Sequence, residues 1–222
     1  MGYAVAIHYR GSEAEARTLA AELGPDADIF RAELTEPGAP AALVAAVKAR
    51  FGRLDLLVNN ASTFTYDTLQ SADAASWRTA IDSNLTAPIF LIQAFAAGGN
   101  QGVVVNLLDQ KVHFPNPDYF SYTAGKVALA GLTQTLTMAL APRVRVCGIA
   151  PGATLPSPEL PAEELPKAGA ATPMGVTSTP DDLARALRFV VETPAFAGQI
   201  LTVDGAESLV GRSRDVAFDE TI

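Results

Sequence analysis

Residues 103–126 read VVVNLLDQKVHFPNPDYFSYTAGK, and the rest of the chain is organised around this stretch. Its apolar start, Val103 to Leu108, predicts a buried strand, and the run from Phe120 to Leu140 predicts a helix. On such a helix Tyr122 and Lys126 lie one turn apart on the same face. The pKa of a free phenol is about 10, and a nearby ammonium lowers it towards neutrality. The pair therefore suits acid–base chemistry, although this spacing also occurs by chance.

The composition fits a folded globular protein. The 222 residues are 49% hydrophobic and 18% charged, with a mean hydropathy of +0.19, which suits one large domain. The net charge of -8 and the pI near 4.7 argue against a nucleic-acid backbone or an anionic membrane as the main partner. We find no unbroken run of about 18 apolar residues, no secretory signal and too few histidines for an evident metal site. A single cysteine, Cys147, excludes an internal disulfide and favours a reducing, cytoplasmic compartment.

Predicted strands alternate with predicted helices, and the strands are continuous apolar runs, as in a parallel sheet that is covered on both faces. Many prolines between 151 and 180 predict an irregular loop. The order predicts one α/β domain, residues 1–222, with a doubly wound, Rossmann-like sheet and sites at the carboxyl ends of its strands. The expected strands are 3–8, 28–34, 54–59, 103–107, 144–149 and 199–203, and the expected helices are 13–23 (capped by Ser12), 37–51, 73–97 (kinked at Pro88), 120–140 and 181–192.

Polar residues stand at the ends of three predicted strands. Asn59 to Ser62 follow the third strand, Asp109 follows the fourth, and Pro151-Gly152 ends the fifth. Together with Asn84 in mid-helix and the tyrosine–lysine pair, this order and spacing resembles the short-chain dehydrogenase/reductase family over nearly the whole chain. No single motif is specific, but the combination is.

The resemblance implies roles for three residues. It implies Tyr122 as the proton donor and acceptor, and Lys126 as the residue that lowers the Tyr122 pKa and holds the nicotinamide ribose. It implies Asn84 as the support of a proton relay through water. On its own, Asn84 is also explained as a residue that satisfies the backbone near Pro88. These roles predict an oxidoreductase.

Two departures from the family pattern narrow the substrate class. Asp109 stands where the family usually has serine, and Ser62 stands where it usually has glycine. An ionised carboxylate accepts hydrogen bonds and repels a developing oxyanion, so Asp109 suits a substrate with N–H donors, such as an aminopyrimidine edge. Phe64 offers an aromatic face to a planar ring. With Tyr122, the combination resembles the pteridine reductase branch, which implies Phe64, Asp109 and Tyr122 as substrate residues; the alternatives are a turn cap for Asp109 and ordinary packing for Phe64.

The stretch His8, Tyr9, Arg10, Gly11, Ser12 follows the first predicted strand and suits a phosphate group. A fixed cation at Arg10, the Ser12 hydroxyl and helix N-terminal amides favour NADP(H) over NAD(H), which calls for an acidic residue there. In pteridine reductases a similar stretch binds the 2′-phosphate; a solvated turn is the alternative. The resemblance implies further cofactor contacts from Glu33, Leu34, Asn60, Ala61, Ser62, Tyr122, Lys126, Pro151, Gly152 and Thr154.

A glycine-rich turn is missing from the sequence. The family opens with a strand and a TGxxxGxG turn that binds pyrophosphate, whereas Gly2 and Gly11 are isolated here. Residues 3–8 resemble the family's second strand, so we expect a domain without its first βα unit and a gap between strands 3–8 and 54–59. Three explanations are open: a start assigned too late, a segment removed from the chain, or a naturally reduced, non-catalytic relative.

The sequence therefore predicts an NADPH-dependent reductase of a pterin-like or folate-like heterocycle. The alternatives are a carbonyl reductase with an unrelated substrate, and a non-catalytic or truncated relative unable to bind cofactor. The resemblance implies a homodimer or homotetramer that pairs helices 73–97 and 120–140. The tail, residues 211–216, is expected to be solvated or to cross to a neighbouring subunit.

Overall fold

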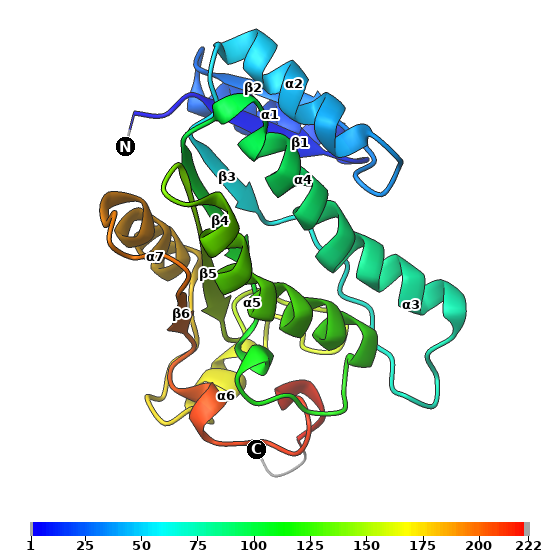
Figure 1. Ribbon diagram of the computed structural model, residues 1–222. Coiled ribbons are helices and arrows are strands. Elements are labelled where there is room, and N and C mark those ends of the chain that lie inside the picture. Colours follow the sequence, from blue (N-terminus) through cyan, green and yellow to red (C-terminus); the bar gives the residue numbers. More distant parts are fainter. Residues whose placement is uncertain (1, 220–222) are drawn as a thin grey trace.

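The computed structural model describes residues 2–219 as parallel strands that alternate with helices (Figure 1). The strands are β1 (Val5–Tyr9), β2 (Ala27–Arg31), β3 (Leu56–Asn59), β4 (Gly102–Leu107), β5 (Val144–Pro151) and β6 (Ile200–Val203). The helices are α1 (Glu13–Leu23), α2 (Ala39–Phe51), α3 (Ala74–Ile81), α4 (Ala87–Ala96), α5 (Phe120–Leu140), α6 (Leu165–Ala170) and α7 (Pro180–Glu192).

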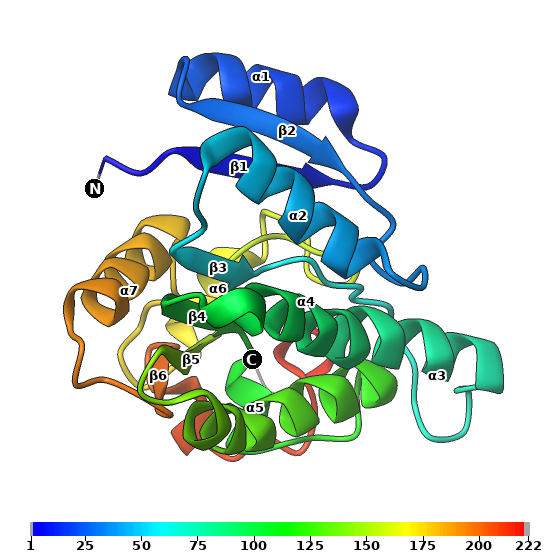
Figure 2. The same ribbon diagram turned by 45° about the horizontal axis from the view of Figure 1, so that its top comes forward.

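The strands form two sheets, and within each sheet every pair of neighbouring strands is parallel. The predicted α/β class is therefore confirmed. β3, β4, β5 and β6 pair in that order, while β1 pairs only with β2 among the described residues. The expected gap thus lies between β1 and β3. Helix α2 packs on α4 and connects the two sheets (Figure 2).

The four-stranded sheet has an apolar layer on each face because side chains alternate along a strand. On β4, Val103 and Val105 face one side and Val104 faces the other. The first side packs on α7 through Ala186 and Val190. The second side packs on α4 and α5 through Ile92, Phe95, Leu136 and Leu140. Helices on both faces make the sheet doubly wound.

The expected helix 73–97 is interrupted by a π-helical turn, η1 (Asp82–Thr86), which lies between α3 and α4. Pro88 stands in the first turn of α4, where a missing N–H costs little, so the irregularity falls just before the proline. By length and composition alone, the stretch Ala74–Gly99, with mean hydropathy 1.2, is apolar enough to cross a membrane, which the search for unbroken apolar runs did not show. Its residues Leu91, Ile92 and Phe95 are buried in the protein core.

Two local expectations are wrong. Ser12 precedes α1, but its side chain makes no capping hydrogen bond, whereas Asp73 and Thr179 form capping boxes at α3 and α7. The proline-rich loop 151–180 contains a helix, α6, which tolerates Pro166 because the proline lies in its first turn.

Two glycines give a matched test of the fold. Gly205 follows β6 with φ +63°, and a Cβ there would collide with the carbonyl oxygen of Val176. Gly131 lies on α5 with open space around it. We expect Gly205→Ala to lower the free energy of unfolding by about 1–3 kcal/mol, because neither the backbone angle nor the neighbouring carbonyl can accommodate the methyl group.

Gly131→Ala is the control, and we expect it to raise the free energy of unfolding by about 1 kcal/mol, since alanine loses less entropy in a helix. Urea denaturation of both variants measures the difference. Equal effects would contradict the close approach at Gly205.

Candidate active site

The parallel register brings the polar islands of the sequence to one edge of the four-stranded sheet. Asn59 pairs in register with Asn106, and Pro151 pairs with Val203. Asn60 to Ser62, Asp109 and Gly152 therefore follow three adjacent strands at their carboxyl ends, where α/β sheets carry their sites.

A hydrogen bond links the two central residues of the site. The Tyr122 hydroxyl donates to Asp109 Oδ2 at 2.9 Å, and Asp109 Oδ1 accepts from the backbone N–H of Lys111 at 2.9 Å. Asp109 is thus both a turn cap and a partner of Tyr122. Lys126 Nζ lies 5.5 Å from the Tyr122 ring centroid and donates to the carbonyl oxygen of Leu107 at 2.7 Å.

The predicted pKa of Tyr122 is wrong in direction. Burial, followed by the charge and hydrogen bond of Asp109, raises the pKa of Tyr122 well above its usual value. Burial also raises the pKa of the Asp109 carboxyl, against the hydrogen bond and charge of Lys111. Burial lowers the pKa of Lys126 to about 8. Tyr122 therefore holds its proton at neutral pH, because desolvation and a facing carboxylate outweigh the nearby ammonium.

Asn84 lies in the π-helical turn η1 and is 1% exposed. Its Oδ1 accepts from the Ser62 hydroxyl at 2.6 Å, and its Nδ2 donates to the Thr63 carbonyl at 3.0 Å. A Cβ at Gly125 would lie 3.0 Å from Asn84 Cβ, so this glycine lets α5 approach the turn closely. Asn84 thus joins the loop after β3 to the helix that carries Tyr122.

Phe64 lies beside Tyr122, and its ring is 40% exposed. The two ring centroids are 4.7 Å apart in an edge-on arrangement. Phe64 also stacks on Tyr119, with centroids 4.0 Å apart and an interplanar angle of 15°. Sequence reasoning missed Tyr119, although its position three residues before Tyr122 placed it near the same helix face. It is fully buried, has a positive φ of 53°, and its hydroxyl donates to Glu159 at 3.0 Å.

The residues expected to hold a cofactor phosphate lie where β1 and β2 end. Arg10 Nε is 3.9 Å from Glu33 Oε2, and its side chain is 67% exposed. Ser12 stands directly before α1. His8 Nε2 lies 2.9 Å from the Ala32 carbonyl oxygen, so this imidazole bridges the two strands. Tyr9 and Leu34, the other residues named for this end, are half-buried beside them.

The loop after β5 is held by short polar contacts. Thr154 Oγ1 donates to the Gly152 carbonyl at 2.9 Å and lies 2.6 Å from Ser178 Oγ. A Cβ at Gly152 would lie 2.8 Å from Glu207 Oε2, so only glycine fits there without displacing that carboxylate. Glu207 had no sequence signal. Burial raises its pKa to about 7, with Asp109 adding to the effect, and its Oε2 has no hydrogen-bond partner among the described residues.

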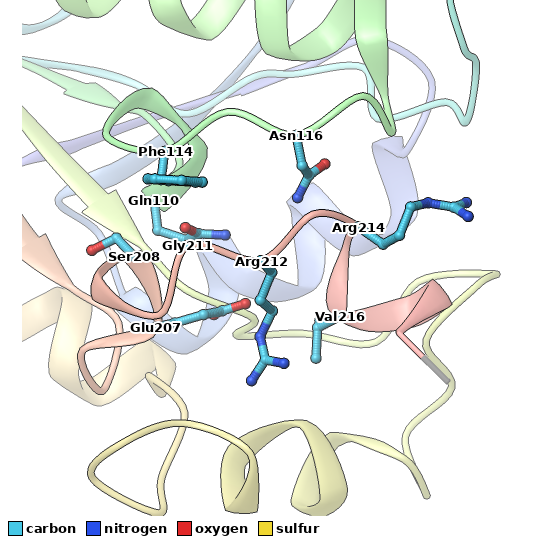
Figure 3. Close-up of a pocket in the computed structure, with 9 residues that line it drawn as sticks. All are labelled: Gln110, Phe114, Asn116, Glu207, Ser208, Gly211, Arg212, Arg214 and Val216. Atoms are coloured by element: carbon cyan, nitrogen blue, oxygen red, sulfur yellow. The ribbon is translucent and has the colours of Figure 1, made fainter. Parts of the chain in front are cut away.

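The tail folds back on its own chain, which corrects the expectation that residues 211–216 are solvated. A small pocket of about 10 Å³ separates it from the loop after β4, enough for one water molecule. Figure 3 shows the lining residues, which are Gln110, Phe114 and Asn116 from the loop and Glu207, Ser208, Gly211, Arg212, Arg214 and Val216 from the segment after β6. The side chain of Arg212 extends away from the loop. The charged contacts that hold the tail join residues far apart in the sequence, so no local pattern signalled them.

The proteins that match this chain are described as reductases and dehydrogenases. Residues 1–206 match the profile of the family described as "Enoyl-(Acyl carrier protein) reductase". Pteridine reductase 1 of Leishmania tarentolae is 33% identical over 205 residues, covering 72% of this chain and 71% of the relative. 3beta-hydroxysteroid dehydrogenase 1 of Eggerthella lenta is also 33% identical, covering 94% of this chain and 85% of the relative.

A solved structure is similar over most of its length. The crystal structure of FolM Alternative dihydrofolate reductase 1 from Brucella suis, in complex with NADP, is 35% identical to this chain. The two superpose with a TM-score of 0.88, covering 94% of this chain and 86% of the other.

Glu207 gives a prediction about pH. Its folded pKa of about 7 lies above the ordinary 4.5, so the folded state favours the protonated form. The stabilisation is complete below about pH 4.5 and is lost as the pH rises towards 7, by on the order of 3 kcal/mol. Glu207→Gln should therefore unfold at a higher temperature than the parent at about pH 8 and at a similar temperature at about pH 4.5.

Thermal unfolding of the parent and Glu207→Gln across this range measures the effect. Glu192→Gln is the control, since Glu192 lies on the surface of α7 in an exposed ion pair. A parallel pH dependence in the parent and Glu207→Gln would show that Glu207 titrates normally.

Proposed function

Because the chain belongs to the short-chain dehydrogenase/reductase family, we propose that it is an NADPH-dependent oxidoreductase that reduces a pterin-like or folate-like heterocycle. The observation that carries the proposal is the position of two groups around Tyr122. The Asp109 carboxylate lies 2.9 Å from the Tyr122 hydroxyl, and the Phe64 ring centroid lies 4.7 Å from the Tyr122 ring centroid. The pteridine reductase and FolM relatives support this substrate class.

The described residues fit the two ends of NADP(H), the 2′-phosphate and the nicotinamide ribose, while no glycine-rich turn for the pyrophosphate occurs among residues 2–219. Arg10 presents a largely exposed guanidinium beside the start of α1, which suits a 2′-phosphate. Lys126 uses one of its three N–H donors on Leu107, which leaves two for ribose hydroxyls. Asn60, Ala61, Ser62, Pro151, Gly152 and Thr154 follow β3 and β5 at the same sheet edge and would line the nicotinamide half of the cofactor. When bound, NADPH supplies the hydride.

Tyr122 supplies the proton in this proposal. It is 7% exposed, and its raised pKa keeps the hydroxyl protonated, so a proton is available for transfer. The raised pKa also makes the phenol a weaker acid than one whose pKa lies near the operating pH, so a bound substrate and cofactor would have to lower it. When the proton has been transferred, Tyr122 is a phenolate. The Lys126 ammonium, 5.5 Å from the Tyr122 ring centroid, stabilises this negative charge. Asn84 holds the Ser62–Thr63 loop in place against α5. In this proposal Asn84 positions that loop, and it also supports the proton relay through water that the family resemblance implies.

Asp109 and Phe64 select the ring. A carboxylate accepts N–H bonds from an amino-substituted ring, and a partly exposed aromatic side chain stacks on a flat one. Both groups lie against Tyr122, so a ring that satisfies them is placed next to the proton donor.

A carbonyl reductase acting on an unrelated substrate is the second candidate. Burial raises the pKa of Asp109, and a protonated carboxyl can donate a hydrogen bond to a carbonyl oxygen as serine does. The hydroxysteroid dehydrogenase relative supports this alternative.

We also propose that the protein is cytoplasmic and assembles through the helices α3, α4 and α5. Large apolar side chains are exposed on these helices, including Trp77, Phe90, Val127 and Leu132. Light scattering of the purified chain distinguishes a dimer or tetramer from a monomer.

Tyr122→Phe tests the proton donor. We expect it to lower kcat about a hundredfold or more, because only the transferred proton is lost. The Kd for NADPH, measured by fluorescence, should change little. Tyr3→Phe is the matched control, since Tyr3 is 41% exposed and precedes β1, outside the candidate site. A Tyr122→Phe variant with near-parent turnover would show that the assignment is wrong.

Asp109→Ser tests the substrate class. The change replaces a charged acceptor with two oxygens by one neutral hydroxyl, which accepts N–H bonds more weakly and can also donate. The kcat/KM for dihydrobiopterin should therefore fall about tenfold or more relative to that for a plain ketone. Steady-state kinetics with both substrates measure the ratio. If both substrates lose activity equally, the carboxylate does not recognise N–H groups.

A further inference from the structure

The C-terminal arm (residues 211–219) is bound to the loop that precedes α5. Arg214 donates two hydrogen bonds to Asp118, at 2.8 and 2.9 Å, and the backbone N–H of Asp215 donates to the same carboxylate at 2.8 Å. The Asp118 side chain is 2% exposed. A buried carboxylate with three donors from one segment is a strong anchor, because losing them leaves a buried charge without partners.

A second ion pair anchors the arm to the start of the loop, at Lys111. Lys111 Nζ pairs with Asp215 Oδ2 at 2.5 Å and donates to the Asp118 carbonyl at 3.2 Å. The Lys111 side chain is 2% exposed, and its own backbone N–H caps onto Asp109. The two anchors therefore flank the loop between Asp109 and Tyr122.

The arm also completes a row of aromatic rings. Phe218 lies 4.6 Å from the Tyr66 ring and 6.1 Å from the Tyr119 ring. Tyr119 stacks on Phe64, and Phe64 meets Tyr122 edge-on. Lys111 Nζ lies 4.6 Å from the Tyr119 ring centroid. The arm thus contacts Tyr66 and, at a longer centroid distance, Tyr119, the ring that stacks on Phe64 beside the proton donor.

Building on the proposed function, we propose that the C-terminal arm is a specificity-determining brace that fixes Tyr119 against Phe64. The brace holds Phe64 in one orientation and keeps the space beside Tyr122 narrow. A flat aromatic heterocycle fits such a space by stacking, whereas a thicker alicyclic ketone needs the rings to separate. Phe218 and Arg214 are positioning residues in this scheme, since they act on the substrate through Tyr119.

Phe218→Ala is the central test. We expect KM for dihydrobiopterin to rise about tenfold, because the substrate loses a well-placed ring contact. The kcat and the Kd for NADPH should stay within about twofold. The kcat/KM for a steroid ketone should stay constant or rise. Phe218→Tyr keeps the ring and should restore the parent KM. Equal losses for both substrates, or no change for either, would overturn the brace.

Hydrogen–deuterium exchange tests the brace without turnover. Arg214→Ala and Phe218→Ala should both speed exchange in residues 110–119, because the loop loses its anchors. Arg188→Ala is the control, since Arg188 forms an exposed pair with Glu192 on α7. Unchanged exchange in the two arm variants would overturn the brace. This result does not depend on turnover, so it is distinct from the failure of the proposed function, which a parent that reduces no pterin would show.

Discussion

The hydrogen bond from Tyr122 to Asp109 is the constraint on which the site depends. It joins the end of β4 to the first turn of α5 across a loop that has little regular structure. Tyr122 is buried and Asp109 is half-buried, so exchanging the bond for water has a cost on the Tyr122 side. Lys126 joins the same two elements through the Leu107 carbonyl, whereas Asn84 and Phe64 reach the site from η1 and from the loop after β3. The centre of the site therefore follows from how closely β4 and α5 approach.

The sheet and most helices could be predicted from the sequence, because apolar runs and their spacing report burial directly. The expected helix ends at Glu13, Leu23, Phe120 and Leu140 match the structure, since helical periodicity and the Gly24-Pro25 stop fix them. The sequence predicted a kink at Pro88, whereas the structure has a π-helical turn just before that proline. That form depends on Asn84 reaching the loop after β3, which is a tertiary contact.

The candidate site was less predictable where electrostatics decide. Spacing placed Lys126 near Tyr122, yet the sign of the Tyr122 pKa shift depends on burial and on the facing Asp109, and neither is visible in a motif. Tyr119, Lys111, Asp118 and Glu207 were missed because each acquires its role from a partner distant in the sequence. The roles assigned to the individual site residues remain predictions.

The anchoring of the arm has a consequence for how the protein matures during synthesis. Asp118 and Arg214 are 96 residues apart, so the loop beside Tyr122 gains this support only after most of the chain has left the ribosome. Until then the Asp118 carboxylate and the Lys111 ammonium lack their partners, and the aromatic row is open on one side. A growing chain can therefore pair β3, β4 and β5 well before it has a finished substrate site, whereas β6 and the arm follow close together at the end of the chain. A protease that removed the arm would return the loop to its unanchored state.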